Sequence, residues 1–203
     1  MDYLEISIKE IDEKTQELYK LIKKDKYEYD LVIFIAKGSY YIGKKLSEYN
    51  KTPLLEIFAT RKGNKIKKIL KPFLKFIPKT ILIKLREKEM KGNYHEKNND
   101  REVSFNKNIY LKYADCKNIL LVDDSVDSGN SVILTKTAIS KYFKKANIKV
   151  AVFNIMSKSS IKVDYTLYHD VMICGPWSND SKYNNTYRDM YNQWKLVQEQ
   201  EEK

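Results

Sequence analysis

Five short apolar runs, separated by segments of helical periodicity, constrain the fold of this chain more than any other feature of its sequence. The run at 31–36 is too apolar for a half-exposed strand, so it predicts a central strand that is buried on both faces. The other four runs predict further buried strands. The runs are LVIFIA (31–36), PLLEIFA (53–59), NILLVD (118–123), IKVAVFNIM (148–156) and VMICG (171–175).

Helical segments are expected between these runs. Apolar residues recur at helical spacing across residues 7–24, and further helices are expected over 40–49 and about 129–145. Strands that alternate with helices predict an α/β fold with a central, mainly parallel sheet and helices on both of its faces. The chain has 203 residues, of which 42% are hydrophobic, enough for one sizeable core. We therefore expect residues 1–203 to form a single domain.

Three aspartates follow the third strand, and small polar residues follow the aspartates. The acids are Asp123, Asp124 and Asp127, and the next four residues are Ser128, Gly129, Asn130 and Ser131. In parallel sheets, ligands bind at the carboxyl ends of strands. Free N–H groups at a helix start, together with a glycine and two hydroxyls, predict a phosphate cradle.

Carboxylates repel phosphate, so the three acids should face another part of the same ligand. Sugar hydroxyls or a Mg²⁺ ion fit this role. The stretch therefore predicts a phosphorylated sugar as ligand, with Mg²⁺ as the cofactor. The alternative is an acidic turn in which Ser128 is only a helix N-cap.

The segment VDDSVDSGNS (122–131) resembles the phosphoribosyl pyrophosphate motif of type I phosphoribosyltransferases, with serines in place of the usual threonines. FIAKGSYYIG (34–43) is similar to the pyrophosphate loop of hypoxanthine-guanine phosphoribosyltransferases. Lys37 and Gly38 match that loop, while Ser39 replaces its second glycine. In that family the peptide bond before this lysine can be cis.

Two further segments carry the resemblance. Lys158, at the end of the strand 148–156, matches the lysine that hydrogen-bonds the exocyclic oxygen of a purine. YNNTYRDM (183–190) is similar to the family's Tyr-Asn-Glu-Tyr-Phe-Arg-Asp-Leu, which makes Arg188 the match of an arginine that contacts pyrophosphate. The purine resemblance also implies that Ile173 contacts the base.

The chain departs from the family at the acceptor end. The family's metal-binding aspartate aligns with Lys182, and Asp180, two residues away, is the predicted substitute. The aromatic residue that stacks on a purine aligns near Met172. ICGPWS (173–178) resembles the Pro-Trp of xanthine-type enzymes, which makes Trp177 a candidate neighbour of the base.

The resemblance implies transfer of a 5-phosphoribosyl group from phosphoribosyl pyrophosphate to a 6-oxopurine-like base, with release of pyrophosphate. Asp127 would be the catalytic residue and manage the acceptor's proton. Asp123 and Asp124 would bind the ribose hydroxyls and, together with Asp180, would bind Mg²⁺. The 5-phosphate would be bound by Ser128, Gly129, Asn130 and Ser131. Pyrophosphate would be bound by Lys37, Gly38 and Arg188. A non-purine acceptor, such as a surface-glycan or lipid-linked group, stays open, as does a non-catalytic regulator that senses phosphoribosyl pyrophosphate or a nucleotide.

Residues 61–91 carry most of the protein's net charge of +11, because twelve Lys and Arg residues there face only Glu87 and Glu89. In the family, an insertion between the second strand and the aspartate strand forms a hood over the site, and residues 60–105 occupy that place here. A basic hood helix that packs on the core is one interpretation. The other is an interfacial helix on an anionic membrane, with Phe73, Phe76 and Ile77 inserted. Nucleic acid is an unlikely partner because no reading module is visible.

The expected location is the cytoplasm, with attachment to a membrane surface through 61–91 as the open alternative. The N-terminus lacks the pattern of a signal peptide, and no apolar run has the length of a membrane span. Cys116 and Cys174 form no CxxC pair, which favours a reducing compartment. Members of the family commonly pair, so the resemblance also implies a homodimer.

Overall fold

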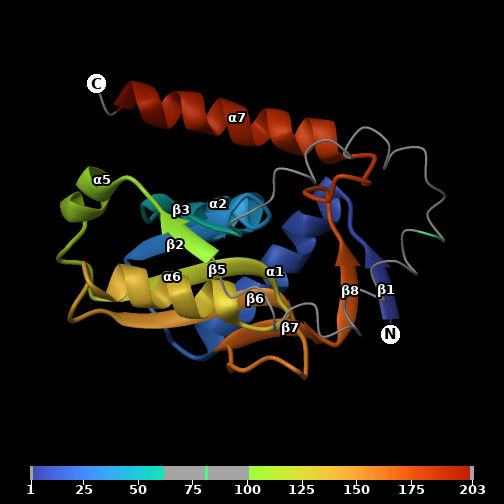
Figure 1. Ribbon diagram of the computed structural model, residues 1–203, viewed down its shortest axis with the longest axis horizontal. Coiled ribbons are helices and arrows are strands. Elements are labelled where there is room, and N and C mark those ends of the chain that lie inside the picture. The colour runs from blue at the N-terminus through green and yellow to red at the C-terminus, as the bar shows by residue number, and fades with distance from the viewer. Residues whose placement is uncertain (1, 62–80, 82–100, 202–203) are drawn as a thin grey trace.

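The computed structural model describes residues 2–61, 81 and 101–201 (Figure 1). The strands are β1 (Asp2–Glu5), β2 (Leu31–Ala36), β3 (Leu54–Arg61), β4 (Arg101–Ser104), β5 (Asn118–Val126), β6 (Asn147–Ile155), β7 (Tyr165–His169) and β8 (Val171–Cys174). The helices are α1 (Ile8–Lys24), α2 (Tyr40–Asn50), α5 (Lys107–Lys112), α6 (Asn130–Ser140) and α7 (Asn184–Glu201).

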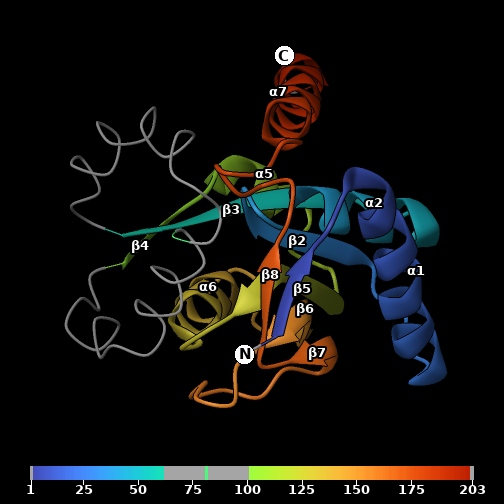
Figure 2. The same cartoon turned by 90° about the vertical axis from the view of Figure 1, so that its right-hand side faces the viewer.

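The central sheet has six strands in the order β4-β3-β2-β5-β6-β7. All neighbouring pairs are parallel except β3 and β4, which are antiparallel. Figure 2 shows α1 and α2 on one side of this sheet and α6 on the other. The predicted fold class, a mainly parallel sheet with helices on both faces, is confirmed.

The apolar runs supply both faces of the sheet at once. In β2, Val32 and Phe34 join the core under α1, α2 and α7, while Leu31 and Ile33 join the core under α5 and α6. Side chains alternate between the faces of a strand, so a strand covered on both sides needs an unbroken apolar run. This is why β2 lacks the polar alternation of an exposed strand.

The last predicted strand, 171–175, is not part of the central sheet. β8 instead pairs in parallel with β1 in a separate two-stranded sheet, in which Leu4 lies opposite Ile173. β7 takes the edge position beside β6. The chain then turns at Asp170, which has a left-handed φ of 57°, and enters β8. Figures 1 and 2 show the β1–β8 ribbon lying across one end of the central sheet.

Two boundaries also differ from the sequence prediction. β5 continues to Val126 rather than ending at residue 123, because its pairing with β6 extends to the Val126–Ile155 pair. Helix α6 ends at Ser140 rather than near residue 145. The residues that follow form turns, and Phe143 points into the core.

Most of the basic insertion lies outside the described residues. Of the range 60–105, the structure describes only Thr60, Arg61, Ile81 and 101–105. The hood helix and the membrane contact through 61–91 therefore stay predictions. Within the described part of the chain, every helix is too short or too polar to cross a bilayer.

Candidate active site

A cavity of about 230 Å³ lies where the carboxyl ends of β2 and β5 meet the first turn of α6. Its lining residues are Ile35, Ala36, Gly38, Ala59, Asp123, Asp124, Ser125, Val126, Asp127, Ser128, Gly129, Asn130, Ser131 and Val132. The structure therefore brings Gly38 together with all seven residues predicted from the aspartate stretch. Carboxyl ends of strands in open α/β sheets are the usual place for a ligand.

The last residues of β5 place the carboxyl groups of Asp123 and Asp124 at this cavity. The Asp124 N–H donates to Asp123 Oδ1 at 2.9 Å, and Asp123 is 8% exposed. The Asp124 carboxyl group faces Gly38 so closely that a Cβ on Gly38 would lie 2.9 Å from its Cγ. Burial, together with the negative charge of Asp127, raises the pKa of Asp124 above its usual value. A cationic or hydroxyl-rich ligand would stabilise this arrangement.

The loop after β5 has the backbone shape of an anion cradle. Gly129 is the N-cap of α6 and has a φ of 88°, a left-handed conformation that glycine adopts without strain. The helix begins with the bond from the Ile133 N–H to the Gly129 carbonyl at 2.9 Å. The N-cap is Gly129, which has no side chain, so the alternative in which Ser128 is the N-cap is wrong. A loop of this shape before a helix is a common place for an anion, because N–H groups of the first turn point toward it.

A second segment supports this loop from behind. The N–H and the hydroxyl group of Ser160 both lie within hydrogen-bonding distance of the Ser128 carbonyl, at 3.2 Å and 2.8 Å. A Cβ on Gly129 would lie 2.8 Å from Ile161 Cγ1. The cradle is therefore held between β5 and residues 156–161, which follow β6. Lys158 belongs to this supporting segment, where it is exposed.

The loop after β2 forms the opposite wall of the cavity. The Ala36–Lys37 peptide bond is cis, as the resemblance implied. Ser39, which stands where the family has a second glycine, is fully buried. Its hydroxyl group lies 2.6 Å from the Ile35 carbonyl and 3.0 Å from the Val122 carbonyl. Ser39 therefore ties the end of β2 to β5, and the missing glycine does not open the loop.

Solved structures provide the comparison at this point, because no family model and no curated protein matches the sequence. A purine phosphoribosyltransferase from Pyrococcus horikoshii superposes with a TM-score of 0.59 at 17% identity, over 88% of this chain and 95% of that one. A xanthine-guanine-hypoxanthine phosphoribosyltransferase from Helicobacter pylori gives 0.57 at 14% identity, over 86% and 91%. A hypothetical protein from Neisseria gonorrhoeae, solved with bound ppGpp, gives 0.58 at 15% identity, over 93% and 94%.

The chain has a type I phosphoribosyltransferase fold. The resemblance that the motifs suggested is therefore confirmed at the level of the fold. Within the phosphoribosyltransferase fold, the cavity occupies the carboxyl end of the sheet and contains the whole aspartate-to-serine stretch.

Five predicted site residues do not line the cavity of this phosphoribosyltransferase fold: Lys37, Lys158, Ile173, Asp180 and Arg188. Ile173 is partly buried in β8 and packs against the core. Arg188 is exposed on α7, directly after the buried Tyr187. Asp180 lies in the loop before α7. The cavity lining therefore gives no support for the roles predicted for these five residues, and those roles stay predictions.

Trp177 is held by packing. A Cβ on Gly175 would lie 2.4 Å from the Trp177 ring, and the ring centroid lies 6.1 Å from that of Tyr187. Met172, near the position of the family's stacking aromatic, is 5% exposed. Trp177 is half-buried, and its place beside a base stays a prediction.

The end of β5 fits a divalent cation that is bound jointly with a ligand's own oxygens. Mg²⁺ commonly takes one or two carboxylates and completes its shell with water and phosphate oxygens. Asp123 and Asp124 supply such carboxylates, and a cation beside them would favour the ionised form of Asp124, whose pKa is raised by burial. No three His, Cys, Asp or Glu side chains within 2–61, 81 and 101–201 form a metal site on their own. Asp180 as a further ligand stays a prediction.

Tyr187 is a site residue that the sequence analysis missed. Its hydroxyl group lies 3.0 Å from the Lys37 carbonyl and 2.6 Å from the Gly38 carbonyl, so it holds the loop after β2. A signal was present in the sequence. Tyr187 follows YNNT in the motif 183–190, at the position where the family pattern has phenylalanine, and only tyrosine adds a hydroxyl there.

Proposed function

We propose that this chain transfers the 5-phosphoribosyl group of phosphoribosyl pyrophosphate to a 6-oxopurine-like base and releases pyrophosphate. One observation carries the proposal. A single cavity in a phosphoribosyltransferase fold joins the glycine loop after β2, the acids at the end of β5 and the cradle at the start of α6. These three parts suit pyrophosphate, ribose hydroxyls and a terminal phosphate.

The start of α6 would bind the 5-phosphate. The N–H groups from Ser128 to Ser131 and the positive end of the helix dipole attract an anion. The left-handed Gly129 lets the backbone approach the phosphate closely. Asp123 and Asp124, which line the same cavity, would accept hydrogen bonds from the two ribose hydroxyls.

Asp123 and Asp124, with Asp180 as the proposed third carboxylate, would also hold Mg²⁺ together with the donor. A bound Mg²⁺ would neutralise the charge that develops on the leaving pyrophosphate. Burial raises the pKa of Asp124, and a bound cation or hydroxyl donors beside it would favour its ionised form.

Asp127 would act on the acceptor. The bond between C1 of the ribose and the pyrophosphate oxygen breaks, and its electron pair leaves with the pyrophosphate. A ring nitrogen of the base forms the new bond to C1, and its proton passes to the Asp127 carboxylate. Asp127 lines the cavity between the acids of β5 and the cradle, which suits a group that lies near C1.

The remaining roles follow from the motifs. The Lys37–Gly38 loop and Arg188 would bind pyrophosphate, and Lys158 would donate to the exocyclic oxygen of the base with Ile173 beside it. Met172 is buried and Trp177 is packed on Gly175. A non-purine acceptor, such as a surface-glycan or lipid-linked group, is therefore the second candidate.

A nucleotide-sensing regulator is the third candidate, and one finding favours it. The similar Neisseria gonorrhoeae protein was solved with ppGpp, a ligand that itself carries pyrophosphate groups on a ribose. A cradle for a 5-phosphate and a loop for pyrophosphate would also suit such a ligand. The presence of Asp127 in the cavity supports the enzyme over the regulator.

Pyrophosphate release separates these candidates. Purified protein is incubated with Mg²⁺ and phosphoribosyl pyrophosphate, with hypoxanthine, guanine, xanthine, adenine or no base, and pyrophosphate is quantified. Release that depends on an oxopurine supports the proposed reaction. Donor binding by calorimetry without release by any base supports another acceptor or the regulator, with ppGpp binding as the mark of the latter. The absence of both binding and release would contradict all three.

A further inference from the structure

The hydroxyl group of Tyr187 holds the loop after β2 from α7. It lies 2.6 Å from the Gly38 carbonyl oxygen and 3.0 Å from that of Lys37. Gly38 also lines the cavity, whereas Tyr187 does not, and the Asp124 carboxyl group lies against Gly38. Two consecutive carbonyl groups of the loop are thus directed toward α7.

Because the peptide bond is planar, the orientation of each carbonyl group also fixes the orientation of the N–H group in the same peptide. In a trans peptide the carbonyl oxygen and the N–H point in opposite directions. The peptides after Lys37 and after Gly38 are trans, because Ala36–Lys37 is the sole cis bond within the described residues. When their carbonyl groups face Tyr187, the N–H groups of Gly38 and Ser39 therefore point away from α7.

These two N–H groups have no hydrogen-bond acceptor among residues 2–61, 81 and 101–201. Their neighbours are well bonded, since the Tyr40 N–H reaches the Lys37 carbonyl at 3.3 Å and the Gly43 N–H reaches the Ser39 carbonyl at 2.9 Å. Gly38 lines the cavity and is partly exposed, so its N–H is the donor that this loop can offer there, whereas Ser39 is fully buried.

Tyr187 is itself held firmly. It is 2% exposed, and its ring centroid lies 6.1 Å from that of Tyr40. Its hydroxyl oxygen accepts the Tyr41 N–H at 3.3 Å, which orients the hydroxyl hydrogen toward the two carbonyl groups. Burial raises the pKa of Tyr187 well above its usual value, so the group stays a hydrogen-bond donor at any physiological pH.

The Lys37 side chain belongs to the same contact with α7. Its Nζ lies 4.8 Å from the centroid of the Tyr191 ring, one helical turn beyond Tyr187. The hydroxyl group of Tyr191 hydrogen-bonds Glu56, whose other oxygen accepts from Lys195 at 2.7 Å. The Lys37 side chain therefore lies toward α7, and the loop contributes backbone groups to the cavity.

We propose that Tyr187 is a positioning residue that sets the orientation of the pyrophosphate-binding N–H group of Gly38. The proposal rests on the proposed function, in which this loop binds the leaving pyrophosphate. Tyr187 does not touch the ligand. It acts through the two carbonyl groups that it holds.

The Tyr187→Phe variant tests this by removing one oxygen atom while keeping the ring. The matched control is Tyr40→Phe, because the Tyr40 hydroxyl also joins α7 to α2, through the Met190 carbonyl at 3.2 Å, but does not contact the loop. Calorimetry measures binding of magnesium pyrophosphate and, separately, of ribose 5-phosphate. Tyr187→Phe should weaken pyrophosphate binding about tenfold, or ~1.4 kcal/mol, and leave ribose 5-phosphate binding within twofold. Tyr40→Phe should leave both unchanged.

The outcomes separate this proposal from the proposed function. Wild-type protein that binds pyrophosphate, with Tyr187→Phe binding it equally well, would overturn the positioning role and leave the function intact. Equal weakening of both ligands would show a general loss of structure and would also overturn it. Folded wild-type protein that binds neither ligand would overturn the function and the positioning role together.

A measurement on the wild-type protein keeps the test decisive if Tyr187→Phe does not fold. Magnesium pyrophosphate is titrated into isotope-labelled protein, and the backbone amide resonances are followed by NMR. The Gly38 amide should shift strongly. Shifts confined to other amides would contradict the proposal.

Discussion

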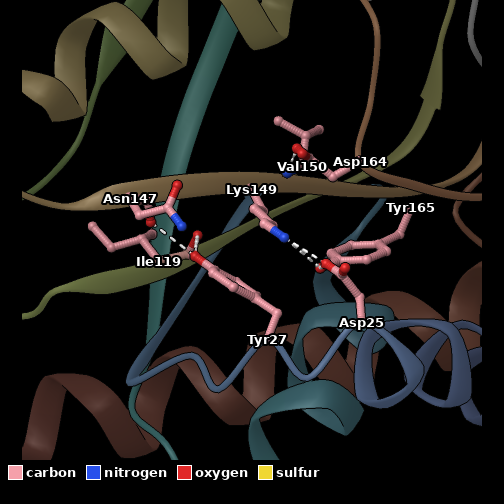
Figure 3. Close-up of polar contacts among 8 residues, drawn as sticks. All are labelled: Asp25, Tyr27, Ile119, Asn147, Lys149, Val150, Asp164 and Tyr165. Carbon is pink, nitrogen blue, oxygen red and sulfur yellow. Dashed lines mark hydrogen bonds and ion pairs between the residues drawn. The ribbon is translucent and has the colours of Figure 1, made fainter.

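Carboxyl groups have different surroundings at the two edges of the central sheet, where the strands begin (the amino edge) and where they end (the carboxyl edge). At the amino edge, Asp25 after α1 accepts from Lys149 Nζ at 2.5 Å and from the Tyr165 hydroxyl group at 2.6 Å (Figure 3). Lys149 also lies over the ring of Tyr27, 4.7 Å from its centroid. Hydrogen bonds from Lys149 and then from Tyr165 lower the pKa of Asp25. This cluster completes its own charge balance.

At the carboxyl edge, the acids lie beside one another. The Asp124 carboxyl group has Gly38, Asp123 and Asp127 as neighbours, and its pKa is raised by burial and then by the charge of Asp127. Acids grouped at a cavity are stabilised when a ligand supplies positive charge or hydroxyl donors. The contrast indicates that the amino edge serves stability, whereas the carboxyl edge serves a ligand.

The largest difference between the two edges is expected when one aspartate at each edge is replaced by asparagine. Asp127→Asn should lower kcat by about 10²–10⁴-fold, because the proton acceptor is lost, while the affinity for phosphoribosyl pyrophosphate changes only a few-fold. Steady-state kinetics and calorimetry with the donor measure the two quantities. Asp164→Asn is the control at the amino edge, where Asp164 Oδ2 accepts the Val150 N–H at 2.7 Å. Equal kcat in the wild type and Asp127→Asn would remove Asp127 from the mechanism.

A smaller effect is expected from filling the space between Gly38 and Asp124. The added methyl group of Gly38→Ala would lie 2.9 Å from Asp124 Cγ, so the loop or the carboxyl group must move. We expect donor binding to weaken about 10–100-fold, since overpacking costs ~1–3 kcal/mol. Gly43→Ala meets Phe34 Cβ at the same 2.9 Å, but away from the cavity. It should lower the melting temperature and leave the Kd of the folded protein unchanged. Similar Kd values for both variants would contradict a ligand-binding role for the Gly38 loop.

The smallest effect is expected at the amino edge. Asp25→Asn should lower Tm by a few degrees or less, because exposed ion pairs contribute little, and leave turnover unchanged. The pKa of Asp25 is lowered by folding, so its contribution is present above the unfolded value of about 3.9 and is lost as pH falls through the folded value. The gap in Tm between wild type and variant should therefore close in acid, as circular dichroism at pH 7 and pH 3 would measure. A gap that is as wide at pH 3 as at pH 7, or a change in donor affinity, would contradict the assignment.

Sequence reasoning succeeded where strand, loop and helix are continuous in the chain. Asp123 to Ser131 form one such unit, so their order alone placed acids and small residues around one cavity. The sheet strands could be predicted for the same reason, since burial on both faces leaves an unbroken apolar run. Gly38, which lines the cavity, was predicted through a motif of this local kind.

Contacts between distant segments could not be predicted in this way. The Tyr187 hydroxyl and the Gly38 carbonyl lie 149 positions apart in the chain, and Lys149 and Asp25 lie 124 apart. β8 was placed in the central sheet because VMIC reads as a buried strand, while its partner β1 is a short mixed segment that carries no clear strand signal. Local pattern gives an element's type but does not give its partner.

The most direct test of the central claim is a crystal structure of the protein soaked with Mg²⁺ and a non-hydrolysable analogue of phosphoribosyl pyrophosphate. The account predicts the 5-phosphate on the N–H groups of Ser128 to Ser131, with the ribose hydroxyls facing Asp123 and Asp124. An analogue bound elsewhere, or a cavity that stays closed to it while the soaked crystals remain intact, would contradict the account.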